Sequence, residues 1–142
     1  MTMETSFTVA AANAILADNF APWVQASRIT VDAVGPDTVR MRIPFSDQLC
    51  RVGGIMSGQA LATGADTAMV LALAAAMGGV LKPCTTVDLN INYMRPITKA
   101  DAVLEAKVKR LGRSLAFCSV DINEAGSGKP AAFATGTFAI LG

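Results

Sequence analysis

A single carboxylate, Asp66, lies in the most apolar stretch of this chain, shortly after a glycine-rich turn that ends at Gly58. Burial of an isolated charge is costly, so a carboxylate in these surroundings needs a functional or structural partner. A helix that begins near Ser57 directs its free backbone N–H groups, including that of Gly58, towards whatever lies in front of it. Donors that stabilise an oxyanion, combined with one carboxylate, are the components of an acyl-transfer site.

The spacing of Gly58 and Asp66 sets a geometric constraint on such a site. Their backbones are separated by ~12 Å along a helix that rises 1.5 Å per residue, so one carbonyl group cannot contact both in one subunit. Two antiparallel copies of the helix, related by a two-fold axis, can bring Gly58 of one chain near Asp66 of the other. We therefore expect an obligate homodimer with sites shared between subunits.

Composition excludes several other kinds of chemistry. The chain has no histidine, which rules out Ser-His and Cys-His mechanisms and argues against a zinc site. Its net charge of +1 gives no indication of a nucleic-acid or membrane partner. Cys50, Cys84 and Cys118 show no CxxC spacing, and no signal peptide is visible, so we expect reduced cysteines in a cytoplasmic protein.

The elements that position these residues can be predicted from periodicity. We expect one domain over residues 1–142, with a helical segment at 1–24 whose helix spans 7–19 and is capped by Thr5 or Ser6. A hairpin of strands 29–33 and 39–43 and a loop at 44–56 precede a long helix at 57–79, which Gly78 and Gly79 close. Strands at 87–93, 102–111, 114–123 and 131–141 then form an antiparallel meander.

The long helix is apolar on nearly every face, which predicts that it is enclosed. Residues 67–81 are too few for a membrane span and follow Gln59 and Asp66, so we interpret the helix as buried inside the protein. The fold class is therefore α+β, a curved antiparallel sheet wrapped around one long apolar helix. With 52% hydrophobic and only 16% charged residues, the chain has few charges for the surface of a lone monomer, which also favours an oligomer.

Two blocks of sequence resemble a known family. Residues 51–59, Arg-Val-Gly-Gly-Ile-Met-Ser-Gly-Gln, followed by Asp66, are similar to a motif that reads Asn/Gln-x-x-Gly-x-x-His-Gly-Gly and is followed by Asp or Glu. Residues 87–96, Val-Asp-Leu-Asn-Ile-Asn-Tyr-Met-Arg-Pro, resemble the first long strand after the helix in the same proteins. These are the hotdog-fold acyl-CoA thioesterases of the phenylacetate-pathway (PaaI-like) type, and the resemblance covers about residues 29–140.

Three positions match the motif and several polar ones differ. Gly54, Gly58 and Asp66 match, whereas Ser57 stands at the family histidine, Gln59 at its second glycine and Arg51 at the Asn or Gln. Val70 occupies a position that is often Thr or Ser in relatives. The resemblance implies hydrolysis of an acyl-CoA by a dimer of dimers, with no cofactor because coenzyme A is part of the substrate, and with no metal.

Roles for individual residues follow from this chemistry, with alternatives left open. The catalytic candidates are Asp66 as base or nucleophile, the Gly58 N–H as oxyanion donor, and Ser57, which is equally well explained as a helix N-cap. Asp66 could instead be a structural acid bonded to Thr63 or Thr67. The candidates for contact with the substrate are Arg51, Gly54, Gln59, Val70, Met94, Arg95, Arg113 and Ser114. Arg51 would either keep Asp66 ionised or pair with a phosphate of coenzyme A.

Two further functions compete with hydrolysis. The substitutions at Ser57 and Val70 favour a non-catalytic protein that binds an acyl-CoA or senses such a ligand. A hydratase is disfavoured, because the hotdog hydratases combine a histidine with an acid and this chain has no histidine. Trp23 and Tyr93 are interpreted as packing residues, and the acyl group cannot be deduced from aromatic residues spread along the chain.

Overall fold

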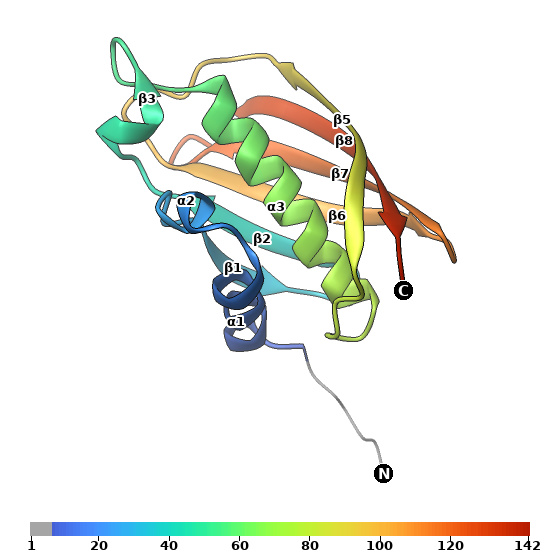
Figure 1. Cartoon of the computed structure of the whole chain (residues 1–142). Helices are drawn as coiled ribbons and strands as arrows, with labels where there is room; N and C mark the ends of the chain where they lie inside the picture. The colour runs from blue at the N-terminus through green and yellow to red at the C-terminus, as the bar shows by residue number, and fades with distance from the viewer. Residues whose placement is uncertain (1–6) are drawn as a thin grey trace.

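The computed structural model describes residues 7–142 and contains one curved six-stranded sheet with the long helix α3 lying across one face (Figure 1). The predicted fold class is confirmed. In chain order the elements are α1 (Val9–Asn19), α2 (Pro22–Gln25), β1 (Thr30–Val34), β2 (Thr38–Ile43), the 3₁₀ turn η1 (Asp47–Leu49), β3 (Cys50–Arg51), β4 (Ile55–Met56), α3 (Gly58–Ala76), β5 (Cys84–Tyr93), β6 (Ala102–Leu111), β7 (Leu115–Glu124) and β8 (Pro130–Ile140).

Helix α3 begins and ends where its sequence dictates. The Ser57 side chain accepts a hydrogen bond from the Ala60 backbone N–H at 3.1 Å, which caps the first turn. Gly78 and Gly79 both adopt positive φ, and the Gly79 N–H returns to the Ala74 carbonyl at 2.8 Å. The helix is therefore held at both ends by local hydrogen bonds that the sequence made recognisable.

The strand order β1-β2-β6-β7-β8-β5 corrects the expected meander. Strands β6, β7 and β8 do form consecutive antiparallel hairpins, but β5 pairs with β8 rather than with its chain neighbour β6. Residues 94–101 therefore carry the chain from one edge of the sheet to β6, which pairs with β2. The sequence could not reveal this, because short connections fix only the pairing of strands that tight turns join.

Close contact between α3 and the sheet depends on two small residues. A Cβ at Gly64 would lie 2.6 Å from Ile43 Cδ1, and a Cβ at Gly136 would lie 2.8 Å from Met69 Cε. Leu71 and Leu73 of α3 are fully buried, and each contributes about 1.5–3 kcal/mol through loss of apolar surface to water. By length and composition α3 could cross a membrane, but 61% of its most apolar stretch is buried inside the protein, as expected for a core helix.

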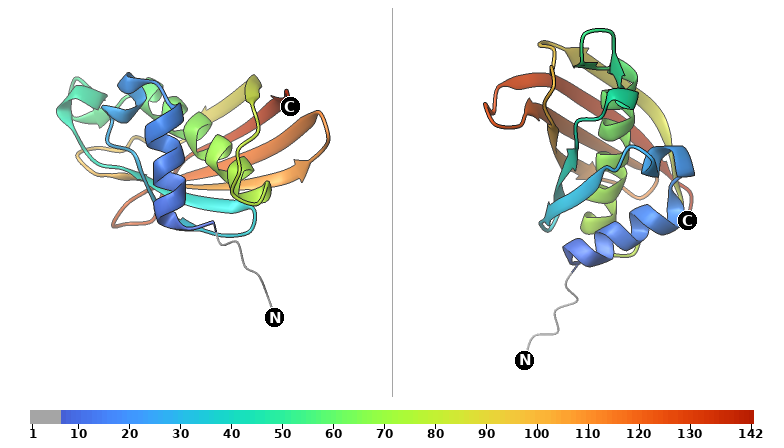
Figure 2. Two further views of the ribbon diagram at one scale, coloured as in Figure 1. Left: turned by 60° about the horizontal axis from the view of Figure 1, so that its bottom comes forward. Right: turned by 90° about the vertical axis from the view of Figure 1, so that its left-hand side faces the viewer.

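The N-terminal segment forms two helices on the same side of the sheet as α3 (Figure 2). Thr8 caps α1 by accepting from the Ala11 N–H at 3.0 Å, so the expected cap at Thr5 or Ser6 is wrong, and those two residues lie outside the described part of the chain. Helix α1 packs against β1 and α3. The expected loop at 44–56 also contains regular structure, namely η1 and the short β3–β4 hairpin.

Candidate active site

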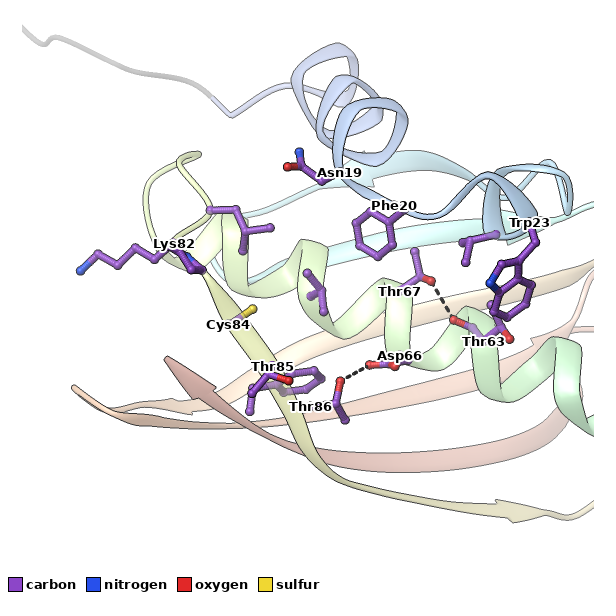
Figure 3. Close-up of a pocket in the computed structure, with 15 residues that line it drawn as sticks. Asn19, Phe20, Trp23, Thr63, Asp66, Thr67, Lys82, Cys84, Thr85 and Thr86 are labelled. Atoms are coloured by element: carbon purple, nitrogen blue, oxygen red, sulfur yellow. Dashed lines mark hydrogen bonds between the residues drawn. The ribbon is translucent and has the colours of Figure 1, made fainter. Parts of the chain in front are cut away.

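Asp66 lies at the centre of a pocket of about 580 Å³ between α3, β5 and the N-terminal helices (Figure 3). Its Oδ1 accepts a hydrogen bond of 2.9 Å from the hydroxyl of Thr86 on β5. The hydroxyls of Thr63 and Thr67 donate instead to helix carbonyls, those of Gln59 and Thr63 respectively, so the alternative in which Asp66 bonds one of these two threonines is wrong. Asp66 is therefore oriented from the strand that faces the helix.

Two opposing effects set the protonation of this carboxyl group. Burial raises the pKa of Asp66, because the charged form loses hydration, and the hydrogen bond from Thr86 lowers it by a smaller amount. Within residues 7–142 the only ion pairs join Arg42 to Asp32 and Asp101, so Asp66 has no cationic partner there. General bases in enzymes are often carboxyl groups in pockets, where burial raises their pKa.

The other walls of this pocket come from the middle of α3, the α1–α2 region, β5 with the segment before it, and β8. Val70, one turn after Asp66, lines the pocket, and its contact with the substrate stays a prediction. Phe20 and Trp23 reach it from the α1–α2 region, and Trp23 is 67% exposed, so it is not the packing residue that we expected. Cys84 also lines the pocket, and burial together with the Asp66 charge raises the pKa of its thiol.

Gly58 lies in a second pocket, of about 320 Å³, at the N-terminus of α3. Three other predicted residues, Arg51, Met94 and Arg95, line the same pocket. Tyr93 was not predicted there, yet its hydroxyl donates to the Gly58 carbonyl at 2.8 Å and its ring lies 3.2 Å from where a Cβ on Gly58 would be. Any side chain at this position would push against the tyrosine.

The first backbone donors of α3 are free to bind a ligand. In an α-helix the first N–H groups have no partner within the helix, and Ser57 satisfies only that of Ala60. In the part of the chain that the structure describes, no protein acceptor is recorded for the Gly58 and Gln59 N–H groups. The amide of Gly58 therefore has the position and the partial positive charge that an oxyanion requires.

The remaining predicted residues lie outside these two pockets. The oxygen of Ser57 serves the N-cap, and the side chain of Gln59 is exposed. Gly54 shapes the β3–β4 turn with a φ of 73° and accepts a hydrogen bond from the Lys99 N–H at 2.9 Å.

Arg113 and Ser114 are at the far end of α3, in the turn between β6 and β7. Arg113 lines a cavity of about 250 Å³ together with Met77 and Lys82. Lys82 also lines the pocket of Asp66, so the two hollows share this side chain. Arg51 and Arg113 thus lie in two different pockets of the protomer, and neither lines the pocket of Asp66.

Thr86, Tyr93 and Trp23 are the main candidates that sequence patterns missed. Alternation in residues 87–93 indicated a strand, but the strand begins at Cys84, so Thr86 lay outside the prediction, and alternation could not show that Tyr93 contacts Gly58. Trp23 follows Pro22 in a four-residue helix that is too short to show a periodicity. The one available signal for Trp23 was its size, because a large aromatic side chain is costly to leave in water.

Comparisons with known proteins agree on one superfamily. The model of the family described as "Thioesterase superfamily" matches residues 53–131. Human acyl-coenzyme A thioesterase 13 is 32% identical over 103 residues, which are 72% of each chain. A putative esterase of Halobacterium salinarum is 31% identical over 98 residues, 66% of this chain and 64% of that protein.

Solved structures agree with the predicted hotdog fold. A putative thioesterase from Silicibacter superposes with a TM-score of 0.86 at 26% identity and covers 99% of this chain and 96% of that one. Zebra fish thioesterase superfamily member 2 gives a TM-score of 0.81 at 25% identity, covering 99% of this chain and all of the other. The Escherichia coli PaaI protein from the phenylacetic acid degradation operon gives 0.80 at 18% identity, covers 96% and 97%, and shows the fold alone.

Proposed function

This chain belongs to the thioesterase superfamily and is a thioesterase, and from that membership we propose that it hydrolyses an acyl-CoA to the free acid and coenzyme A. The observation that carries the proposal is Asp66, a partly buried carboxylate held by Thr86 in a pocket large enough for an acyl group. The named activity of the human relative supports acyl-CoA as the substrate class.

In the proposed reaction, Asp66 acts as a general base or as the nucleophile. As a base it takes a proton from water, the resulting hydroxide adds to the thioester carbonyl carbon, and the carbonyl electrons move onto oxygen. The C–S bond then breaks, and the thiolate of coenzyme A leaves and accepts the proton. As a nucleophile, Asp66 displaces the same thiolate to give a mixed anhydride, which water hydrolyses. In both routes the N–H of Gly58 stabilises the oxyanion.

The composite site requires Gly58 from one subunit and Asp66 from its partner. Within one chain these residues lie in different pockets, so neither pocket alone holds both donor and base. Strand β5 is ten residues long and lies at an edge of the sheet, where an unpaired strand is a template for another chain. Antiparallel pairing of two β5 edges would place the two α3 helices side by side with opposite directions.

One register of this strand pairing brings the Asp66 half of the site in each subunit close to the Gly58 half in the other. Thr86 bonds Asp66 and Tyr93 bonds Gly58, so β5 runs antiparallel to α3 and carries the two halves of the site in the reverse chain order. A pairing with Leu89 opposite Asn90 of the partner subunit brings Thr86, just before the β-bulge between Thr86 and Asp88, close to the partner's Tyr93. The helices then cross at the midpoint between positions 58 and 66, which is the small residue Ala62. Two such dimers would form the expected tetramer.

The test is release of free thiol from a panel of acyl-CoAs, from acetyl and hexanoyl to phenylacetyl and benzoyl. We expect turnover by the native protein and loss of turnover in Asp66→Ala, because the base or nucleophile is gone. Asp121→Asn, at an exposed carboxylate on β7, is the matched control and should be as active as the native chain. No turnover on any substrate, combined with a melting temperature raised by acyl-CoA, would contradict hydrolysis and favour the non-catalytic binding function.

A further inference from the structure

The pocket of Asp66 gathers aromatic side chains that are scattered in the sequence. Phe20, Trp23 and Phe138 all line it, although they come from the loop after α1, from α2 and from β8. Phe138 is fully buried, whereas Trp23 is two-thirds exposed. A tryptophan left this open beside a cavity gains more from an apolar ligand than from water.

The two ends of the pocket differ in charge. Figure 3 shows Trp23 and Thr63 at one end, Lys82 at the other, and Asp66 between them. Lys82 also lines the cavity that contains Arg113, so a second cationic side chain lies in the hollow next to this end of the pocket. The end at Trp23 has no cationic side chain among the pocket residues that the structure describes.

We propose that the α2 end of the pocket binds the acyl group, that Trp23 limits the size of the group accepted, and that the carrier leaves the pocket past Lys82. The proposal rests on the proposed hydrolysis of an acyl-CoA. Such a substrate is itself polarised, because one end is an apolar acyl chain and the other carries phosphates. Phosphates are bound by lysine and arginine, while an acyl chain is bound by apolar and aromatic surface.

The segment that supplies Trp23 lies outside the residues that the family model matches. The family model matches residues 53–131, which contain Gly58, Asp66 and Thr86, whereas α1 and α2 precede it. The proposed reacting groups thus lie inside the matched residues, and one wall of the pocket comes from the segment that precedes them. A wall of that kind can alter the substrate range without altering the reacting groups.

The first experiment measures kcat/KM for straight-chain acyl-CoAs from butanoyl to dodecanoyl. Trp23→Ala should raise the ratio of dodecanoyl to hexanoyl turnover about tenfold, because it lengthens the apolar end of the pocket. Trp23→Phe should change this ratio less, and Phe133→Ala, which removes another exposed aromatic side chain, should leave it unchanged. A uniform loss on all substrates, or an unchanged ratio in Trp23→Ala, would overturn the assignment.

The second experiment tests the direction of the substrate. Lys82→Ala should raise KM about threefold for an acyl-CoA and leave the same acyl ester of pantetheine, which lacks phosphates, unaffected. Lys107→Ala, on the opposite face of the sheet, is the matched control. An altered chain-length profile in Lys82→Ala, with an altered preference between the two carriers in Trp23→Ala, would reverse the direction and refute the proposal.

The failure of the proposed function can be distinguished from failure of this inference. If the native protein releases no thiol from any ester, hydrolysis is refuted while the pocket can still be tested by binding. The same ratio, measured then as dissociation constants of the acyl-CoAs, should still shift in Trp23→Ala. An unshifted ratio of dissociation constants would overturn the inference independently of turnover.

Discussion

The pockets of Asp66 and Gly58 lie on the same helix and have opposite chemical character. The first surrounds a carboxylate whose pKa is raised by burial, with one hydroxyl donor from Thr86. The second surrounds open backbone donors at a helix N-terminus, with Arg51 and Arg95 at its margin. One pocket offers a group that accepts protons, and the other offers groups that stabilise negative charge.

This difference explains why α3 is so long and so apolar. The two functional groups sit on separate turns of a helix whose other faces are buried against the sheet and α1, so neither can move relative to the other. Rigid placement of reacting groups is a large part of catalysis. Each pocket is one half of the proposed site, and single variants disable one half while a mixed dimer of two variants brings intact halves together.

The largest effect is expected at the carboxylate. Asp66→Asn should lower kcat by about 10²–10⁴-fold, because the amide cannot take a proton from water or attack the thioester. The same variant should melt at a higher temperature than the native protein near pH 7. Since burial raises the folded-state pKa of Asp66, the folded protein binds more protons than the unfolded chain in the window above the unfolded pKa, and its stability falls as pH rises through that window.

Asparagine does not titrate, so the variant lacks this loss of stability. The difference in melting temperature should therefore shrink on the acid side, where Asp66 is protonated in both states. Thermal melts from pH 4 to pH 8, together with thiol release, measure both effects. A variant that is inactive and also less stable at neutral pH would show that Asp66 has a structural role instead.

A dimer of two different inactive variants tests whether the two halves of the site come from different subunits. Gly58→Val should be inactive, because a branched side chain there pushes Tyr93 aside and covers the free amide. Equal amounts of the Gly58→Val and Asp66→Asn proteins are unfolded, combined and refolded. Half of the resulting dimers then contain one chain of each variant, and each of these has one intact site. Activity should then return to about a quarter of the native value. No recovery, with mixed dimers present by mass spectrometry, would place both halves in one chain.

Most of the fold could be predicted from the sequence, because most of its elements depend on local signals. The cap at Ser57, the glycines after α3 and the tight turns around β7 are readable from residue type alone. The position of β5 was not readable, because its pairing with β8 is decided by packing across the whole sheet. That single long-range feature brings Thr86 to Asp66 and Tyr93 to Gly58, so it also explains why the site was predicted only in part.

A smaller effect is expected at the hydroxyl that orients Asp66. Thr86→Val keeps the shape of the side chain and removes a hydrogen bond that lowers the pKa of Asp66. The pKa should rise, so the acid limb of the kcat/KM profile should move to higher pH while the alkaline plateau stays close to the native value. Thr135→Val, at an exposed threonine of β8 outside the pocket of Asp66, is the matched control. A uniform fall at every pH would indicate a different role for Thr86.

The smallest effect on activity is expected at Ser57, where the family has its histidine. Because the Ser57 oxygen accepts from the Ala60 N–H, Ser57→Ala should cost about 1 kcal/mol of stability, or about 2–4 °C in melting temperature. Turnover should stay close to native, because the Ser57 side chain caps the helix and does not line the pocket of Gly58. Ser57→Asp preserves an N-cap and should restore the stability. A variant of native stability that has lost most of its turnover would make Ser57 a catalytic residue, and the N-terminal pocket would then supply more than backbone donors.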